Sequence, residues 1–378
     1  MRVELIATAT FGLEAVVKRE LQGLGYTDVT VSDGKVAFSG DEKAIPRANL
    51  RLRSADRVLL QVGEFKALTF DELFEKTKAL PWSDWIPPDG KFPVNGKSVK
   101  SKLFSISDCQ AIVKKAVVES LKARYAVEWF PETGPEFAIQ VALLNDVATL
   151  TIDTSGEGLH KRGYRQEAGE APLKETLAAA LVQLSYWRKD RLLLDPFCGS
   201  GTIPIEAALI GRNIAPGLNR NFASEHWPAV DRGIWKEARV EAFKAIDTGA
   251  ELKIKASDID SRVIEVAKEN AAEAGVDDCV EFAVKPMEKV TIDREYGVVI
   301  TNPPYGRRIG SKKELGKLYK DMARIFGADP TWSVYVLTAD EGFEGFYGAK
   351  ASRKRKLYSG NIRVDYYQYY GRRPPKIK

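Results

Sequence analysis

The stretch Leu192–Glu206, LLLDPFCGSGTIPIE, contains the pattern that decides the fold. The three leucines at its start are typical of a short strand buried on both faces of a parallel sheet. Asp195 ends this run, Gly199 and Gly201 allow a tight turn, and the apolar spacing from Thr202 onward predicts an amphipathic helix. A strand, a glycine turn and a helix N-terminus together present unpaired N–H groups to an anionic or polar ligand. Taken alone, a Gly-x-Gly turn is also compatible with a structural connection.

Two later stretches repeat the pattern of a buried strand followed by polar residues. Lys253–Ser257 predicts a strand that runs into Asp258 and Asp260. In doubly wound folds a carboxylate at the tip of the second strand binds ribose hydroxyls, and Asp258 is the better placed because it is nearer the strand. A third strand at 298–300 runs into Asn-Pro-Pro-Tyr at 302–305. These signals predict a ligand site at the carboxyl edge of one sheet.

The motifs Asp-Pro-Phe-Cys-Gly-Ser-Gly-Thr at 195–202 and Asn-Pro-Pro-Tyr at 302–305 resemble those of class I S-adenosylmethionine (SAM) methyltransferases that act on exocyclic amino groups of nucleobases. The resemblance implies SAM as the cofactor. It assigns Asn302, Pro303, Pro304 and Tyr305 as catalytic residues. It assigns SAM binding to Pro172, Asp195, Phe197, Cys198, Gly199, Ser200, Gly201, Thr202, Asp258, Ile259 and Met287. Many relatives carry a carboxylate or amide near the adenine after the strand at 280–284, where this sequence has Lys285-Pro286-Met287.

Two further stretches narrow the resemblance. Asp153–Thr176, with DTSGEGLHKRGYR and then APLKET, and Ala7–Glu14, ATATFGLE, are similar to bacterial guanine-N2 RNA methyltransferases that carry a THUMP domain. The likeness covers essentially the whole chain and is strongest to the single-methyltransferase form of the 23S rRNA enzyme. It implies RNA as the partner, either 23S rRNA or a ribosomal precursor, with tRNA as the second choice.

The predicted fold class is α/β. A Rossmann-like class I methyltransferase sheet lies at the C-terminus and follows α+β ferredoxin-like and THUMP domains. We expect a ferredoxin-like domain over 1–66, a THUMP RNA-binding domain over 67–155, a linker over 156–170 and the methyltransferase domain over 171–378. An insertion at 212–250 is far longer than the usual ~2–6-residue connection. Its aromatic residues Phe222, Trp227, Trp235 and Phe243 are expected to pack it onto the methyltransferase domain, or alternatively to flank the base pocket.

Composition limits the remaining possibilities. The formal net charge of +5 is mild, so RNA contacts must come from local patches such as the basic segment 91–103. The cations of 160–165 could bind phosphate, or could pair with Glu167 and Glu170 in a linker. Three unpaired cysteines fit a reducing cytoplasm, two histidines argue against a metal site, and no apolar run reaches the ~20 residues of a membrane span.

The chemistry explains why an asparagine and two prolines would stand together. An exocyclic amine is a weak nucleophile, and two acceptors, the Asn302 oxygen and the Pro303 carbonyl, would orient it and offset its growing positive charge. Tyr305 could stack on an extruded base. The same tetrapeptide serves DNA adenine-N6 methylation, which is one alternative, and tRNA guanine-N2 methylation is another. A catalytically inactive RNA-binding protein is a third, and a dinucleotide-dependent oxidoreductase fits least because Gly-x-Gly-x-x-Gly is absent.

Overall fold

The computed structural model describes residues 2–165, 173–304 and 312–375, which form two compact units. The first unit comprises Met1–Ala9, Val17–Leu159 and Arg220–Ala242. The second comprises Thr10–Val16, His160–Asn219 and Phe243–Lys378.

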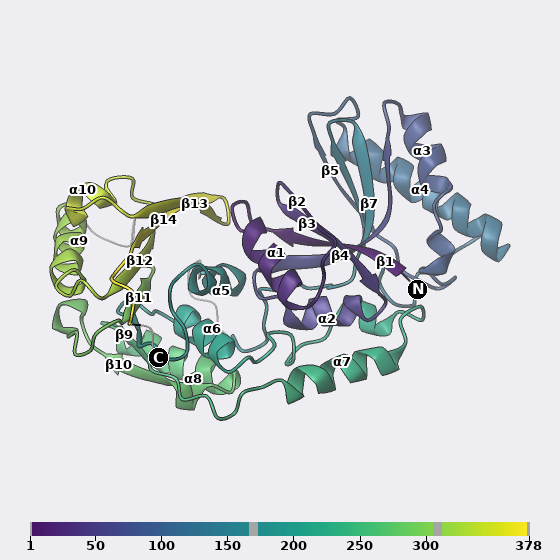
Figure 1. The fold of residues 1–378 in the computed structure, drawn as a ribbon. Helices are drawn as coiled ribbons and strands as arrows, with labels where there is room; N and C mark the ends of the chain where they lie inside the picture. The colour runs from purple at the N-terminus through teal and green to yellow at the C-terminus, as the bar shows by residue number, and fades with distance from the viewer. Residues whose placement is uncertain (1, 166–172, 305–311, 376–378) are drawn as a thin grey trace. The chain divides into compact units, whose positions relative to one another are not determined.

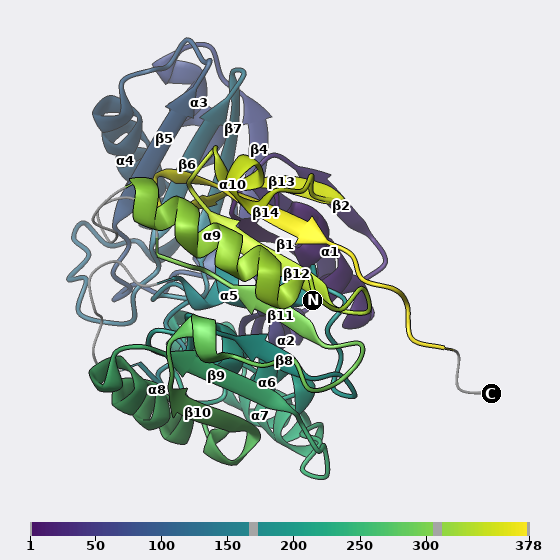
Figure 2. The ribbon, with the colours of Figure 1, turned by 90° about the vertical axis from the view of Figure 1, so that its left-hand side faces the viewer.

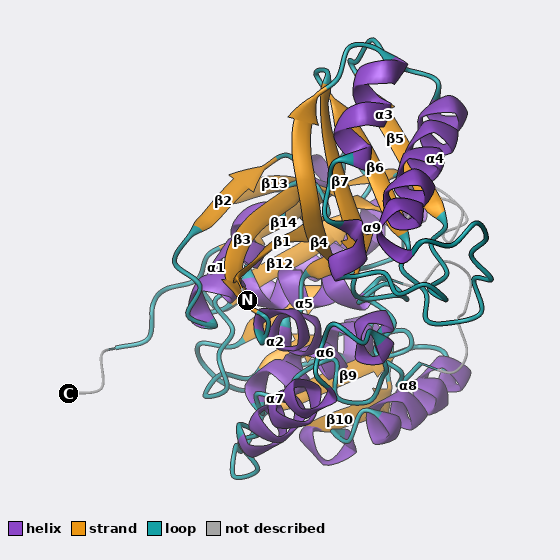
Figure 3. Ribbon diagram, turned by 90° about the vertical axis from the view of Figure 1, so that its right-hand side faces the viewer, coloured by secondary structure: helices purple, strands orange, loops and turns teal. Residues whose placement is uncertain are grey.

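The first unit contains a seven-stranded sheet, in the order β2-β3-β1-β4-β7-β6-β5. The elements of this part of the chain are β1 (Arg2–Ala9), α1 (Glu14–Gly23), β2 (Val29–Ser32), β3 (Lys35–Asp41), α2 (Ala44–Arg51), β4 (Ala55–Lys66), α3 (Phe70–Lys78), β5 (Val94–Val99), α4 (Ile106–Tyr125), β6 (Ile139–Leu144) and β7 (Val147–Asp153). Strand β4 pairs with β1 on one side and with β7 on the other, both antiparallel. The segments expected to form ferredoxin-like and THUMP domains therefore share one continuous sheet, and α3 and α4 lie beside its β5–β6 end (Figure 3).

The insertion packs differently from our prediction. Its segment Arg220–Ala242, which contains most of α7 (Arg232–Lys244), belongs to the first unit and not to the methyltransferase unit. Trp227 stacks on Phe137 with ring centroids 4.8 Å apart, and Phe222 stacks on Trp235 at 5.2 Å. The fourth aromatic residue, Phe243, is 70% exposed. The prediction of packing onto the methyltransferase domain was wrong, because aromatic residues indicate burial without indicating the partner surface.

The second unit contains the methyltransferase-like sheet, in the order β10-β9-β8-β11-β12-β14-β13. Its elements are α5 (Glu175–Gln183), β8 (Leu193–Asp195), α6 (Thr202–Gly211), β9 (Ile254–Asp258), α8 (Ser261–Glu273), β10 (Val280–Val284), β11 (Val298–Thr301), α9 (Lys312–Phe326), β12 (Ser333–Thr338), α10 (Phe343–Tyr347), β13 (Arg353–Ser359) and β14 (Ile362–Tyr369). Strands β8 to β12 are parallel, and β14 runs antiparallel to β12. Strands β13 and β14 form an antiparallel hairpin at one edge of this sheet.

The two faces of this sheet are covered by different helices. Along β11, Val298 and Ile300 belong to the core formed with α5, α6 and α8, whereas Val299 belongs to the core formed with α9 and α10. This follows from the two-residue period of a strand. Figure 1 shows the two groups of helices on opposite sides of the sheet, and Figure 2 shows α9 lying across it. In the ranges that the structure describes, none of the helices has the length and hydropathy needed to cross a bilayer.

Candidate active site

The three sequence motifs meet at the carboxyl edge of the methyltransferase sheet. Leu193 of β8 pairs with Val298 of β11, and Asp195 pairs with Ala256 of β9, so the loops that follow these strands are neighbours. From β8 the chain continues to β9 on one side of the sheet and later to β11 on the other, which makes this edge a topological switch point. A cavity of about 590 Å³ opens here. Its lining includes Phe197, Gly199, Asp258, Ile259, Met287, Asn302 and Pro304.

The glycine turn faces this cavity through Gly199. Its φ is +51°, and a Cβ added there would have no heavy atom within 4 Å, so the backbone borders open space. Its N–H donates to Oδ2 of Asp258 at 3.1 Å, and Oδ1 of the same carboxylate accepts from the N–H of Asp260 at 3.1 Å. Asp258 therefore fixes the turn and also lines the cavity, where the second lone pairs of its oxygens can accept further hydrogen bonds.

The other residues of the predicted SAM-binding motif lie behind the turn. Gly201 has a φ of +84°, and a Cβ there would come within 3.1 Å of the Ala267 side chain, so this glycine permits close packing against α8. The carbonyl of Ser200 accepts from the Asn270 amide at 3.0 Å. Cys198 and Thr202 are buried and, like Gly201, do not line the cavity. Their assignment as SAM-binding residues stays a prediction.

A buried carboxylate joins the glycine turn to the loop that follows β11. Asp195 is 1% exposed, and its Oδ1 accepts both the Thr301 hydroxyl at 2.7 Å and the Phe197 N–H at 3.2 Å. Burial, with a smaller contribution from the charge of Asp258, raises the pKa of Asp195 to about 7. Thr301 immediately precedes Asn302 in the chain, so this hydrogen bond ties the two functional loops together.

Asn302 provides an acceptor for a ligand. Its side-chain Oδ1 is buried and has no hydrogen-bond partner among the residues that the structure describes. Buried polar atoms are almost always paired, so this amide oxygen is a candidate contact for a ligand in the cavity. Pro304 lines the cavity with it, and Pro303 is buried. Tyr305 and Pro172, both predicted site residues, lie outside the described residues.

The structure adds cavity residues that the sequence analysis did not identify. Pro286 and Glu288 flank Met287 in the lining, so a carboxylate does follow β10, immediately after the stretch Lys285-Pro286-Met287. Helix α9 contributes a further group, namely Glu314, Lys317, Leu318 and Asp321. The amphipathic pattern of α9 was visible in the sequence, but the pattern does not reveal which cavity the polar side of a helix borders.

In the basic segment 160–165, two arginines pair with carboxylates of the methyltransferase core, and the predicted partners Glu167 and Glu170 lie outside the described residues. Arg162 is buried and forms an ion pair with Glu206 of α6 at 3.2 Å. Arg165 pairs with Glu175 of α5 at 3.1 Å and donates to the Thr202 hydroxyl. These two arginines join the segment to the methyltransferase core, and phosphate binding by the segment stays a prediction. Over the described ranges, His, Cys, Asp and Glu side chains form no group of three that could hold a metal ion.

This architecture defines the class of protein. A mostly parallel seven-stranded sheet with an antiparallel strand near one edge, and a cavity at its switch point, is that of a class I methyltransferase. The chain belongs to the family described as RMKL-like methyltransferase domain, which matches residues 162–368. Residues 4–59 match the RlmL ferredoxin-like domain, and residues 67–153 match the THUMP domain.

Similar proteins extend over the whole chain. A Bacillus subtilis protein named "Putative RNA methyltransferase YpsC" is 55% identical, with 99% of this chain and 97% of that protein covered. A crystal structure from Listeria monocytogenes, described as a "predicted N6-adenine-specific DNA methylase", is 55% identical over 98% of this chain and 97% of that one, with a TM-score of 0.94. SMU.472, crystallised with S-adenosylhomocysteine (SAH), is 46% identical over 99% of both chains, with a TM-score of 0.93.

Proposed function

We propose that this protein transfers the methyl group of SAM to the exocyclic N2 amine of a guanosine in RNA, with 23S rRNA as the substrate and the cytoplasm as the place of action. The observation that carries the proposal is the buried, unpaired Oδ1 of Asn302, which lines the same cavity as Gly199 and Asp258. This set fits SAM and a base amine together, because one wall offers a glycine turn and a carboxylate and the other offers an amide oxygen. The cavity volume falls within the range of cofactor sites, roughly 300–1,000 Å³.

The residues of the β11 loop would activate the amine by holding its hydrogens. One N–H would donate to Oδ1 of Asn302 and the other to the carbonyl of Pro303, so that the nitrogen lone pair points along the line of transfer. Because Pro304 follows it, the backbone of Pro303 is restricted to extended conformations, which helps to fix the direction of that carbonyl. SAM supplies a methyl group on a positively charged sulfur. The N–C bond forms as the C–S bond breaks, the sulfur keeps the electron pair, and the amine releases one proton to solvent.

The first unit supports RNA as the substrate. Residues 67–153 match the THUMP domain, and Lys97, Lys100 and Lys102 are exposed on and after β5. Phe104 lies beside them with 81% of its surface exposed. Exposed cations next to an aromatic face are the combination that binds RNA phosphates and unstacked bases.

The decisive experiment identifies the modified nucleoside. Ribosomal RNA, tRNA and genomic DNA are prepared from cells that lack the gene and are incubated with the purified full-length protein and SAM carrying a labelled methyl group. We expect labelled N2-methylguanosine in 23S rRNA and none in the other two. The matched control is the Asn302→Ala variant, which should bind SAH and leave all three unlabelled.

Each other outcome selects a different function. Label in N2-methylguanosine of tRNA would keep the chemistry and replace the substrate. Label in N6-methyladenine of DNA would overturn the proposal, as would the absence of label in all three nucleic acids together with tight SAH binding. The nuclease map of the labelled RNA then gives the position of the nucleotide.

A further inference from the structure

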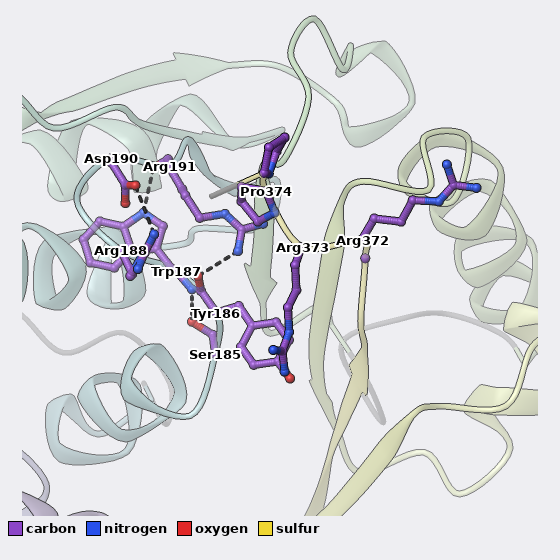
Figure 4. Close-up of a pocket in the computed structure, with 11 residues that line it drawn as sticks. Ser185, Tyr186, Trp187, Arg188, Asp190, Arg191, Arg372, Arg373 and Pro374 are labelled. Carbon is purple, nitrogen blue, oxygen red and sulfur yellow. Dashed lines mark hydrogen bonds and ion pairs between the residues drawn. The ribbon is translucent and has the colours of Figure 1, made fainter. Parts of the chain in front are cut away.

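A second cavity, of about 710 Å³, lies in the methyltransferase unit away from the active site. One wall is the loop 185–191, which leads from α5 into β8, and the other is the segment 371–375, which follows β14 (Figure 4). Both walls adjoin the amino ends of the parallel strands. The N–H of Gly371 donates to the hydroxyl of Ser333, the first residue of β12, at 3.1 Å. The active site lies at the other end of these strands, roughly 20 Å away for a six-residue strand.

The charge of this groove is strongly positive. Arg188, Arg191, Arg372 and Arg373 line it against a single described carboxylate, Asp190. Arg188 and Asp190 form an ion pair at 3.2 Å, but their side chains are 70% and 60% exposed. An ion pair this exposed is weak in water, so an incoming anion can displace it.

Arg191 makes the groove a built site for an anion. It is 7% exposed, and its guanidinium donates to three backbone carbonyls, those of Tyr186 at 2.8 Å, Tyr296 at 2.6 Å and Gly297 at 3.4 Å. Of its five N–H donors, two remain for a ligand. In the part of the chain that the structure describes, Arg191 forms no ion pair within 4.0 Å, so its buried charge lacks a counter-ion. Burial lowers the pKa of Arg191 by more than the nearby charge of Asp190 raises it.

An aromatic face stands beside these cations. Tyr186 is 39% exposed, its N–H donates to the Tyr335 hydroxyl at 2.9 Å, and its ring packs on Tyr370 at 4.8 Å between centroids. In Figure 4 the side chain of Arg373 lies on the side of Tyr186, whereas Arg372 points away from it. A fixed, half-exposed ring among arginines is what single-stranded nucleic acid binds, with a base on the ring and phosphates on the cations.

We propose that this groove binds a single-stranded segment of the substrate RNA, with phosphates at Arg191, Arg372 and Arg373 and a base stacked on Tyr186. The inference rests on the proposed function in taking RNA as the substrate. Its position at the opposite edge of the sheet means that it would contact nucleotides well removed from the target base. The groove would therefore add affinity and orientation without contacting SAM.

The test compares charge-matched variants of the full-length protein. The probe is a mixed-sequence 12-nucleotide single-stranded RNA that contains 4-thiouridine, and the second probe is its fully paired duplex. Arg372→Gln with Arg373→Gln removes two groove cations, and Tyr186→Leu removes the stacking face. Lys244→Gln with Lys268→Gln is the control, because both lysines are exposed and lie outside the groove.

We expect the arginine double variant to bind the single strand about ten-fold more weakly. The slope of log affinity against log salt concentration should become shallower by about 0.7 or more, which corresponds to the loss of about one phosphate contact or more. Tyr186→Leu should weaken binding by about five-fold or more and abolish the photo-crosslink to the peptide that contains residue 186. The lysine control should match the wild type, and SAH affinity should be unchanged in every variant.

Three results would overturn the groove assignment. The first is wild-type RNA affinity in both groove variants, and the second is an equal weakening of duplex binding in these variants. The third is that the variants lose binding to a poly-glutamate peptide while RNA binding is unchanged, which would assign the groove to an acidic protein. Because the assay measures binding, it is independent of the methylation product. A labelled product other than N2-methylguanosine would overturn the proposed function, but it would not affect the assignment of the groove as an RNA-binding site.

Discussion

Replacing Asp195 by asparagine should stabilise the protein at alkaline pH. Both hydrogen bonds that the structure gives this carboxylate, from Thr301 and from Phe197, end on Oδ1. An asparagine side chain of the same shape can keep both with its own oxygen. The substitution therefore removes the buried charge while leaving the geometry intact.

The expected size follows from the pKa. The carboxyl ionises near 3.8 in the unfolded chain and near 7 in the folded protein, where burial favours the neutral form. Between these values the folded state holds one more proton than the unfolded state, so the stability of the wild type falls as pH rises and then stays constant above about pH 7. At about 1.4 kcal/mol per pH unit, the advantage of the variant should grow by roughly 3 kcal/mol between pH 5 and pH 8.

Thermal unfolding followed by differential scanning fluorimetry measures this difference. For a domain of about 150–250 residues, roughly 3 kcal/mol corresponds to a gap in Tm that widens by about 6–12 °C over that pH range. Asp277→Asn, at an exposed position, is the control, and its difference in Tm from the wild type should stay constant over this pH range. A gap for Asp195→Asn that stays constant within about 2 °C would refute the reasoning, because it would mean that Asp195 ionises alike in both states.

Three further substitutions test other parts of the structure. Asn302→Ala should lower the rate of single-turnover methyl transfer by about 10²–10³-fold, since the Asn302 oxygen would act on the amine only. It should change SAH affinity, measured by calorimetry, by less than about two-fold. Equal losses in transfer rate and in SAH affinity would contradict that role. Asp258→Ala should weaken SAH binding by about ten-fold or more, because it removes the predicted ribose acceptor and also the hydrogen bond that fixes Gly199. Unchanged SAH affinity would exclude Asp258 from the SAM site. Glu206→Ala should lower the free energy of unfolding by about 3–5 kcal/mol, because it removes the carboxylate that forms an ion pair with buried Arg162. Replacing both residues by methionine should recover most of this loss in urea unfolding. No recovery would show that the pair contributes more than a cancelled charge.

The active-site half of the fold was predictable because its signals are local. The strands after which Asp195, Asp258 and Asn302 stand are each short apolar runs ended by a polar or glycine-containing loop, and the structure places β8, β9 and β11 within one or two residues of the predicted bounds. Parallel strands of one sheet end at one edge, so the convergence of the three loops followed without knowledge of the packing.

The features that could not be predicted all depend on long-range pairing. Nothing in the residues of β4 shows that its far edge pairs with β7, which joins the two N-terminal segments in one sheet. The aromatic residues of Arg220–Ala242 showed burial, and only the structure shows that Trp227 stacks on Phe137. Likewise Arg191 reads as an ordinary loop cation in the sequence, whereas in the structure it is buried among carbonyls.

Two acidic residues explain how the site holds its geometry. Asp195 links the turn at Phe197 to the end of β11 at Thr301, and Asp258 links the loop that follows β9 to Gly199. Methyl transfer requires the reacting atoms to approach within about 3–3.5 Å in line, and hydrogen bonds between neighbouring strand ends fix such distances better than long loops do. The same rigid edge would suit the exocyclic amine of any base. Selection of the substrate must then come from elements outside this edge, which is the role we assign to the exposed cations and aromatic residues of the THUMP segment and of the arginine groove.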